Sequence, residues 1–175
     1  MLESVGWVRR TIEFRVAAVT LGVGFLVGSE LVPAHAFAPA QLSTPAVALD
    51  IPLVPLALWN LSVLVMLLSG LLTGGLAAIL TLFGTGFQTG LTAATAVSAG
   101  VPMGTVILLI APHALLEAPS LLLVGSIGLR GFALLLGPDE AAQRHYLPVV
   151  ASASLLLLMA ALIEAFGTPF LSRSE

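Results

Sequence analysis

Residues 102–136 form a largely apolar stretch that is too long for one ordinary membrane helix. As a single helix, its 35 positions would extend about 52 Å, whereas the hydrocarbon core of a bilayer is about 30 Å thick. Two full spans joined by a turn would need more residues than the stretch contains. Pro112 and Pro119 lie inside it, and each removes one helical hydrogen bond. We therefore expect a broken or re-entrant element around residues 102–119, followed by a spanning segment.

The composition of the chain indicates a membrane protein. Of its 175 residues, 58% are hydrophobic and 9% are charged, whereas soluble domains contain about 25% charged residues. The chain has no cysteine, which excludes disulfides and thiolate-bound metals, and no lysine, which excludes Schiff-base and P-loop chemistry. Its net charge of -3 comes without a basic patch, so we expect no nucleic-acid partner.

The apolar runs predict an all-α integral membrane bundle of about five transmembrane helices. Each run supplies roughly the 20 residues that a spanning helix needs, and the single predicted domain covers residues 1–175. The predicted spans are residues 16–32, 51–72, 74–99, the broken element at 102–136, and 147–166.

The arginines set the expected orientation. Those near the start of the chain and around the polar turn at residues 137–145 are expected in the cytoplasm by the positive-inside rule. They are Arg9, Arg10, Arg15, Arg130 and Arg144. The proline-rich segment 33–50 contains no arginine and is expected outside. We therefore predict a multi-pass protein of the plasma membrane with a cytoplasmic N-terminus.

Ala34, His35 and Ala36 offer a different interpretation of the first apolar run. They would fit the cleavage site of a signal peptide. The run before them is long for a signal peptide, so we expect the first span to be retained.

His113 and Glu117 are ionisable residues within the long apolar stretch. They are four positions apart, so a helix places them on one face. The favoured interpretation is a hydrogen-bonded pair that stabilises the broken helix, and a proton or ion relay is the alternative. Two potential ligands are fewer than zinc requires, so no metal site is predicted. No nucleophile motif or cofactor fingerprint is present, which predicts a non-enzymatic protein without a cofactor.

Other polar residues in the predicted spans have structural interpretations. Asn60 is expected to link helices through its amide. Arg130 is expected to extend to the cytoplasmic interface. Glu164 is expected at the opposite membrane face, which disfavours an ion pair with Arg130. Glu30 is predicted on the same face as Glu164, so these two carboxylates are candidates for a shared site or a helix contact.

Small residues are concentrated in the third predicted span. Gly86 and Gly90 form a G-x-x-x-G pair, which allows two helices to approach closely. A ligand path along this small-residue surface is the alternative interpretation.

Three blocks of sequence resemble the stage II sporulation protein M family of bacterial and archaeal membrane proteins. The first begins at Trp59 with W-N-L-S-V-L-V-M-L-L-S-G-L-L-T-G-G and continues into G-T-G-F-Q-T-G. The second is A-P-H-A-L-L-E-A-P, followed by a Gly-Leu pair, and the third is A-A-L-I-E-A-F-G-T-P. Positions that match the family's pattern include Asn60, Gly70, Gly74 or Gly75, Pro112, His113, Glu117, Pro119, Gly128, Leu129 and Glu164.

The resemblance covers roughly residues 55–170 and implies a polytopic helical protein of about five spans. It also implies an anchor or localiser within a membrane complex. We therefore expect a membrane scaffold or assembly subunit whose partners are the lipid bilayer and other membrane or cell-envelope proteins, with a homo-oligomer as an alternative. The competing functional hypothesis is a transporter or permease-like subunit with an intramembrane His113–Glu117 site, paired with a separate ATPase.

Overall fold

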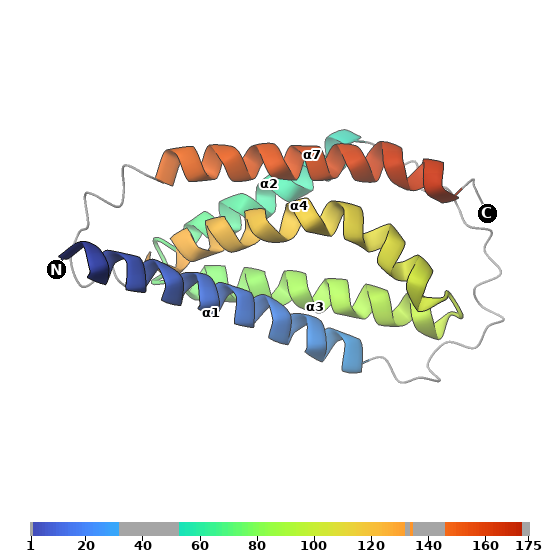
Figure 1. Ribbon diagram of the computed structural model, residues 1–175, viewed down its shortest axis with the longest axis horizontal. Helices are drawn as coiled ribbons and strands as arrows, with labels where there is room; N and C mark the ends of the chain where they lie inside the picture. Colours follow the sequence, from blue (N-terminus) through green and yellow to red (C-terminus); the bar gives the residue numbers. More distant parts are fainter. Residues whose placement is uncertain (1, 32–52, 132–133, 135–145, 173–175) are drawn as a thin grey trace.

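Every regular element that the structure describes is an α-helix. The computed structural model describes residues 2–31, 53–131, 134 and 146–172. Its helices are α1 (Leu2–Glu30), α2 (Leu53–Ser69), α3 (Leu76–Ser98), α4 (Met103–Leu129) and α7 (Tyr146–Ser172). Successive helices run in opposite directions along the bundle (Figure 1). The prediction of an all-α bundle is confirmed for this part of the chain. The predicted loop at 33–50, including Ala34–Ala36, and the turn at 137–145 lie outside the described residues.

Three stretches are by themselves long and apolar enough to cross a bilayer. They are Ile12–Glu30, Leu76–Ser98 and Tyr146–Ile163. Helix α4 is also long and apolar enough to cross a bilayer when its two parts are taken as one span. Helix α2 has 17 residues, the lower limit of the range of about 17–25 residues for a spanning helix. The membrane-spanning character of the chain is thus confirmed, and a total of five spans stays a prediction.

The described helices pack through small and aliphatic side chains and expose many of their large ones. The buried cluster consists of Ala17, Leu64, Leu67, Ala78, Leu82, Leu121, Val124, Ala153 and Leu157. On the outside, Leu115 of α4 is 73% exposed, and Leu108 and Leu158 are also exposed. Water would penalise such a surface, but lipid tails are as apolar as leucine. The exposed leucines are therefore where a bilayer would contact the protein.

Helix α4 is bent and crosses the bundle without turning back. Its two parts, Met103–Pro112 and Ala114–Leu129, form an angle of 56°. Pro112 lies at the bend, and its ring and missing N–H disrupt the hydrogen bonds of the preceding turn. The ends of α4 lie at opposite ends of the bundle (Figure 1). The predicted broken element is therefore present as a bend of 56° in α4, and its place in a bilayer, as a bent span or a re-entrant segment, stays a prediction. Pro119 lies within the second part and is exposed.

Helix α4 is also the centre of the bundle. It packs against α1, α2, α3 and α7, and no other described helix contacts all the rest. Contacts also join α1 to α3, α3 to α2, and α2 to α7, whereas α1 and α7 do not contact each other. These contacts surround α4 on every side except the one between α1 and α7. Figure 1 shows α4 between these two helices.

The turn between α2 and α3 depends on two glycines with positive φ. Gly74 has φ 62° and Gly75 has φ 89°, a backbone region that side chains with a Cβ disfavour. The N–H of Gly75 donates to the carbonyl oxygen of Gly70 at 2.7 Å, which satisfies a carbonyl at the end of α2. The hydroxyl of Thr73 accepts from the N–H of Ala77 at 3.1 Å at the start of α3. This short turn holds α2 and α3 antiparallel.

Candidate functional site

Helices α1 and α3 form the most extensive contact among the described helices. Gly24 and Gly28 of α1 lie against the backbone of α3. A Cβ at Gly24 would collide with the carbonyl oxygen of Phe83, and a Cβ at Gly28 with that of Phe87. Carbonyl oxygens over glycine Cα atoms are typical of helices joined by weak Cα–H···O contacts. The two backbones are therefore as close as helix packing allows.

The same arrangement is repeated from the other helix. A Cβ at Gly86 of α3 would collide with the carbonyl oxygen of Leu21, and a Cβ at Gly90 with that of Phe25. Each helix thus supplies a G-x-x-x-G pair to the other. The structure places Gly86 and Gly90 in a close helix contact, and the matching pair on α1 was not singled out in the sequence.

A second glycine contact joins α2 to the end of α4. A Cβ at Gly128 would collide with the carbonyl oxygen of Leu67, and a Cβ at Gly131 with that of Gly70. At Gly70, a Cβ would lie 2.8 Å from the Cβ of Ala78 on α3. Gly70 and Gly128, which match positions of the family pattern, thus lie where α2, α3 and α4 meet. Their role in the structure is close packing.

A cavity of about 320 Å³ lies between α1, α3 and α4. Its walls are small and aliphatic residues with one aromatic residue, Phe25, and two threonines, Thr85 and Thr89. Gly22 of α1 also lines it, and a Cβ at Gly22 would meet nothing within 4 Å. The cavity lies close to the middle of the spanning stretches Ile12–Glu30 and Leu76–Ser98. A volume of about 320 Å³ lies at the lower end of the range for small-molecule sites, about 300–1,000 Å³.

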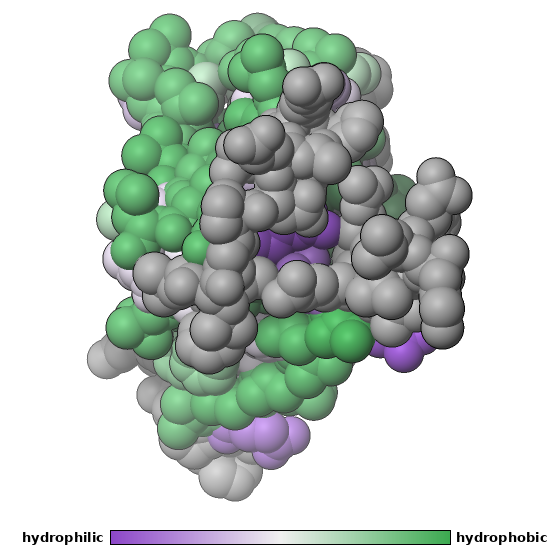
Figure 2. Space-filling view, turned by 90° about the vertical axis from the view of Figure 1, so that its left-hand side faces the viewer, coloured by the Kyte–Doolittle hydropathy of each residue, from purple (hydrophilic) through white to green (hydrophobic). Residues whose placement is uncertain are grey.

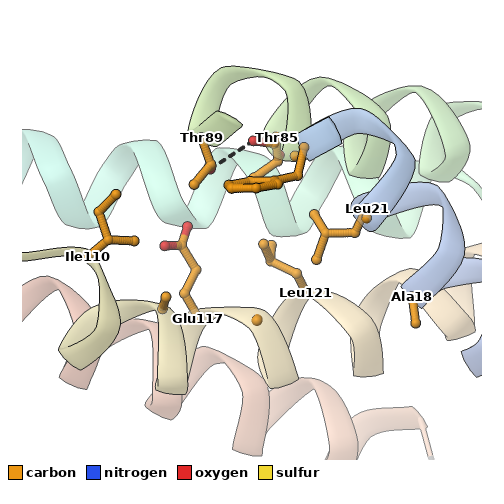
Figure 3. Close-up of a pocket in the computed structure, with 12 residues that line it drawn as sticks. Ala18, Leu21, Thr85, Thr89, Ile110, Glu117 and Leu121 are labelled. Atoms are coloured by element: carbon orange, nitrogen blue, oxygen red, sulfur yellow. Dashed lines mark hydrogen bonds between the residues drawn. The ribbon is translucent and has the colours of Figure 1, made fainter. Parts of the chain in front are cut away.

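Glu117 is the one ionisable residue among the described side chains that line this cavity. It comes from α4, one turn beyond the bend, and its carboxylate points toward α3 and Thr89 (Figure 3). The hydroxyl of Thr89 donates to the carbonyl oxygen of Thr85 at 2.9 Å. Its proton is therefore engaged, and its lone pairs remain available as acceptors. The described part of the site is thus one carboxyl group and one acceptor hydroxyl in an apolar space.

Two other predicted site residues have described backbones only. His113 lies at the bend of α4, one helical turn before Glu117, and Glu164 lies in the last third of α7. Their side chains lie outside the described part of the structure. The His113–Glu117 hydrogen bond therefore stays a prediction. Asn60 is buried in α2, with 8% of its surface exposed, and its role as a link between helices also stays a prediction.

Arg130 lies at the end of α4 and forms an ion pair that the sequence analysis missed. Its Nε donates to the Glu13 Oε2 of α1 at 2.8 Å, and the two side chains are 15% and 13% exposed. The guanidinium also lies over the ring of Tyr146, 5.7 Å from its centroid, at the start of α7. Burial lowers the pKa of Arg130, but the hydrogen bonds to Tyr146 and Glu13 outweigh burial and raise it above its ordinary value. The arginine thus stays charged and joins three helices.

The expectation that Arg130 extends to the cytoplasmic interface stays a prediction, and the structure adds its ion pair with Glu13. Glu13 lies between Arg10 and Arg15 in the sequence, which are predicted on the same side as Arg130, so pairing opposite charges by predicted side would have identified this pair. Figure 2 shows the end of the bundle where α1 begins, with hydrophilic residues in the middle of the face and apolar ones around them.

The structure does not show the predicted helix contact between Glu30 and Glu164, because the helices that carry them, α1 and α7, do not contact each other. Glu30 ends α1 and is exposed, and α1 does not contact α7. Helix α4 separates them, because both helices pack on it. Position 164 is about 27 Å along α7 from Tyr146 at 1.5 Å per residue. It therefore lies far from Arg130, as expected.

The side chains that the structure describes include no group of three His, Cys, Asp or Glu residues that would hold a metal ion. Glu117 lines the cavity without a second acidic residue among its lining. The arrangement is thus suited to hydrogen bonding, charge pairing or proton exchange at one carboxyl group.

Comparison with known families identifies one match. The family described as Stage II sporulation protein M matches residues 16–169, which is most of the chain. No curated protein and no solved structure matches the chain. The matched region includes all of α2, α3 and α4, and with them the cavity and Glu117.

Proposed function

The chain belongs to the Stage II sporulation protein M family, and we propose that it acts as a non-enzymatic assembly subunit that gathers other envelope proteins within the membrane. The membrane-spanning helices and the family together support a multi-pass membrane protein. An assembly role requires a rigid body with a surface left for partners. The glycine contacts and the ion pair of Arg130 with Glu13 supply the rigidity.

The uncovered side of α4 is the observation that carries this proposal. Helix α4 packs on four neighbours, yet α1 and α7 do not close over it. Leu115 and Pro119 of α4 are exposed one turn apart, and we place them on the side of α4 that the described helices leave uncovered. A transmembrane helix of a partner protein would complete the ring of helices around α4 by packing against these two residues. The surface is apolar, so recognition would depend on shape rather than on charge.

Co-purification in a mild detergent tests the assembly role. We expect the tagged chain, purified from its own membrane, to retain a second protein in fixed proportion. Leu115→Trp should remove that protein, because the larger side chain blocks the uncovered side of α4. Leu155→Trp is the matched control, since Leu155 is an exposed leucine of α7. Recovery of this chain alone would contradict the proposal, as would equal retention of the partner by both variants.

A second function, transport or permeation, is supported by the cavity at Glu117. A carboxyl group in an apolar space near the middle of the spans is the kind of residue that intramembrane proton and ion pathways use. The bend of α4 lies one turn away, and interrupted helices are common at transport sites. We propose that the N-terminus is cytoplasmic. Transport would then pass between the cytoplasm and the outside through the region around Glu117.

Proton flux into proteoliposomes tests the transport role. We expect a pH-sensitive dye to report flux for the wild type, and Glu117→Gln should abolish it because the amide does not exchange a proton at neutral pH. Glu30→Gln is the control, since Glu30 is exposed at the end of α1. Flux that is equal in the wild type and in Glu117→Gln would rule out Glu117 as the transport site.

A further inference from the structure

The turn between α2 and α3, residues 70–75, exposes apolar side chains at the end of the bundle where α1 begins (Figure 1). Its Leu72 is 89% exposed, the highest value among the large hydrophobic residues of the described part of the chain. Leu76, at the start of α3, is also exposed. No Asp, Glu, Lys or Arg lies between Asp50 and Glu117, so the turn carries no charge. Turns that face water are usually polar, so this one is unusual for a turn in water.

Polar groups of this turn bond within the chain. Five N–H groups donate to backbone oxygens of the turn or of the end of α2 at 2.7–3.1 Å, and they belong to Gly70, Leu71, Leu72, Thr73 and Gly75. The Thr73 hydroxyl donates to the Ser69 carbonyl at 3.2 Å and accepts from the Ala77 N–H at 3.1 Å. The Ser69 hydroxyl donates to the Met66 carbonyl at 2.7 Å. Backbone near lipid requires partners of this kind within the protein, and these donors have them.

The length of α2 gives an independent reason to place the turn in lipid. The 17 residues of α2 extend about 25 Å, whereas the hydrocarbon core is about 30 Å thick. Exposed apolar side chains continue from Val65 and Met66 of α2 to Leu72 of the turn. The turn thus offers the missing apolar length at the end of α2. Without it, the bilayer would have to become thinner around this helix, which costs free energy.

The contacts of the turn with α4 indicate its depth. A Cβ at Gly131 would collide with the carbonyl oxygen of Gly70, and a Cβ at Gly75 would lie 3.4 Å from the Cα of Leu129. Both ends of the turn are therefore level with Arg130, which pairs with α1 close to the start of its spanning stretch. The interfacial layer adds about 5–8 Å on each side of the hydrocarbon core. A short turn at this level lies within that layer.

We propose that the α2–α3 turn lies in the interfacial layer of the adjacent leaflet, with the side chain of Leu72 among the acyl chains below the headgroups. The partner of this surface is thus the lipid itself, and the turn completes the span of α2. A soluble protein is the alternative occupant, but interfaces with soluble proteins have a polar rim, and this turn carries no charge. The inference goes beyond the assembly and transport roles, because neither depends on the depth of this turn.

Spin labelling measures the depth of Leu72. The chain has no cysteine, so Leu72→Cys creates a single labelling position in the full chain, which is placed in phosphatidylcholine nanodiscs. Oxygen concentrates in hydrocarbon and a nickel chelate concentrates in water, so the ratio of their collision rates with the label increases with depth. Leu155→Cys, at an exposed leucine of α7, is the lipid reference. Gln143→Cys, in the polar turn predicted at residues 137–145, is the water reference.

We expect the oxygen-to-nickel ratio at Leu72 to be nearer to the ratio at Leu155 than to the ratio at Gln143. Because the side chain of Leu72 is 89% exposed, a label there should leave the packing of the bundle unchanged. The purified chain contains no soluble partner, so protection of the label from the nickel chelate would come from lipid. A ratio nearer to that at Gln143 would overturn the proposal and leave the turn open to a soluble protein.

A second measurement uses bilayers of two thicknesses and no label. Leu72→Asp should lower the thermal unfolding midpoint by several degrees in dioleoyl phosphatidylcholine and by less in the thinner dimyristoyl phosphatidylcholine. The reason is that the cost of a charge increases with its depth in the bilayer, and a thicker bilayer covers the turn more deeply. Gln143→Asp is the control and should leave the midpoint unchanged in both lipids. An unchanged midpoint for Leu72→Asp, or an equal decrease in both lipids, would contradict the proposal.

Discussion

Replacement of Gly90 by leucine is expected to lower the stability of the bundle strongly and to separate α1 from α3. A Cβ at Gly90 collides with the carbonyl oxygen of Phe25 and lies 3.0 Å from the N–H nitrogen of Ser29. Both groups belong to the backbone of α1, so they cannot rotate away as a side chain would. Overpacking of this kind costs about 1–3 kcal/mol for a small addition, so Gly90→Ala should show part of the effect and leucine more.

Gly84 provides the matched control on the same helix. A Cβ there meets nothing within 4 Å, and replacing a helical glycine by alanine gains up to about 1 kcal/mol in helix propensity. Gly84→Ala and Gly84→Leu should therefore leave the thermal unfolding midpoint in nanodiscs unchanged or raise it. Equal midpoints for the leucine variants at positions 84 and 90 would show that α1 and α3 are not in glycine contact.

Breaking the Arg130–Glu13 ion pair should have the next largest effect. The two side chains are mostly buried, with 15% and 13% of their surfaces exposed. Removing one partner leaves the other charge unpaired in the protein interior, which lowers the free energy of unfolding by about 3 kcal/mol or more for buried pairs. We expect Arg130→Gln and Glu13→Gln each to lower the free energy of unfolding by about this amount.

The double variant separates pairing from packing. Glu13→Gln with Arg130→Gln removes both charges, so it should recover much of the stability lost in either single variant. Chemical unfolding of the four proteins in one detergent gives the coupling energy between the two positions. Single effects that simply add in the double variant would mean that the ion pair does not stabilise the bundle.

The Glu117 site shows what could be inferred from the sequence and what could not. An ionisable residue in a long apolar stretch is costly unless it is accommodated, so Glu117 was a candidate from its position alone. Thr89 and Gly22 carried no such signal, because both are common in membrane helices. They belong to the site only because α1 packs on α3 and both pack on α4.

The broken element shows the same limit within one helix. The length of the stretch and its two prolines predicted an interruption, and the bend is at Pro112. Sequence length alone did not distinguish a bend from a re-entrant segment. The angle of 56° and the position of the two ends of α4 at opposite ends of the bundle (Figure 1) are visible only in the tertiary structure. Pro119 lies within the second part of the helix and is exposed.

The sequence by itself determined that this is an all-helical membrane protein. That conclusion depends on local properties, because apolar runs must satisfy their own backbone hydrogen bonds in lipid, and helices do so within one segment. Only the tertiary structure decided which helices are neighbours. Arg130 and Glu13 are 117 positions apart, and Gly24 and Gly90 belong to different spans. In a bilayer, an apolar side chain is equally stable facing lipid or another helix, so hydrophobicity does not determine which helices pack together. Close contact between backbones determines it, and that contact exists only in the packed bundle.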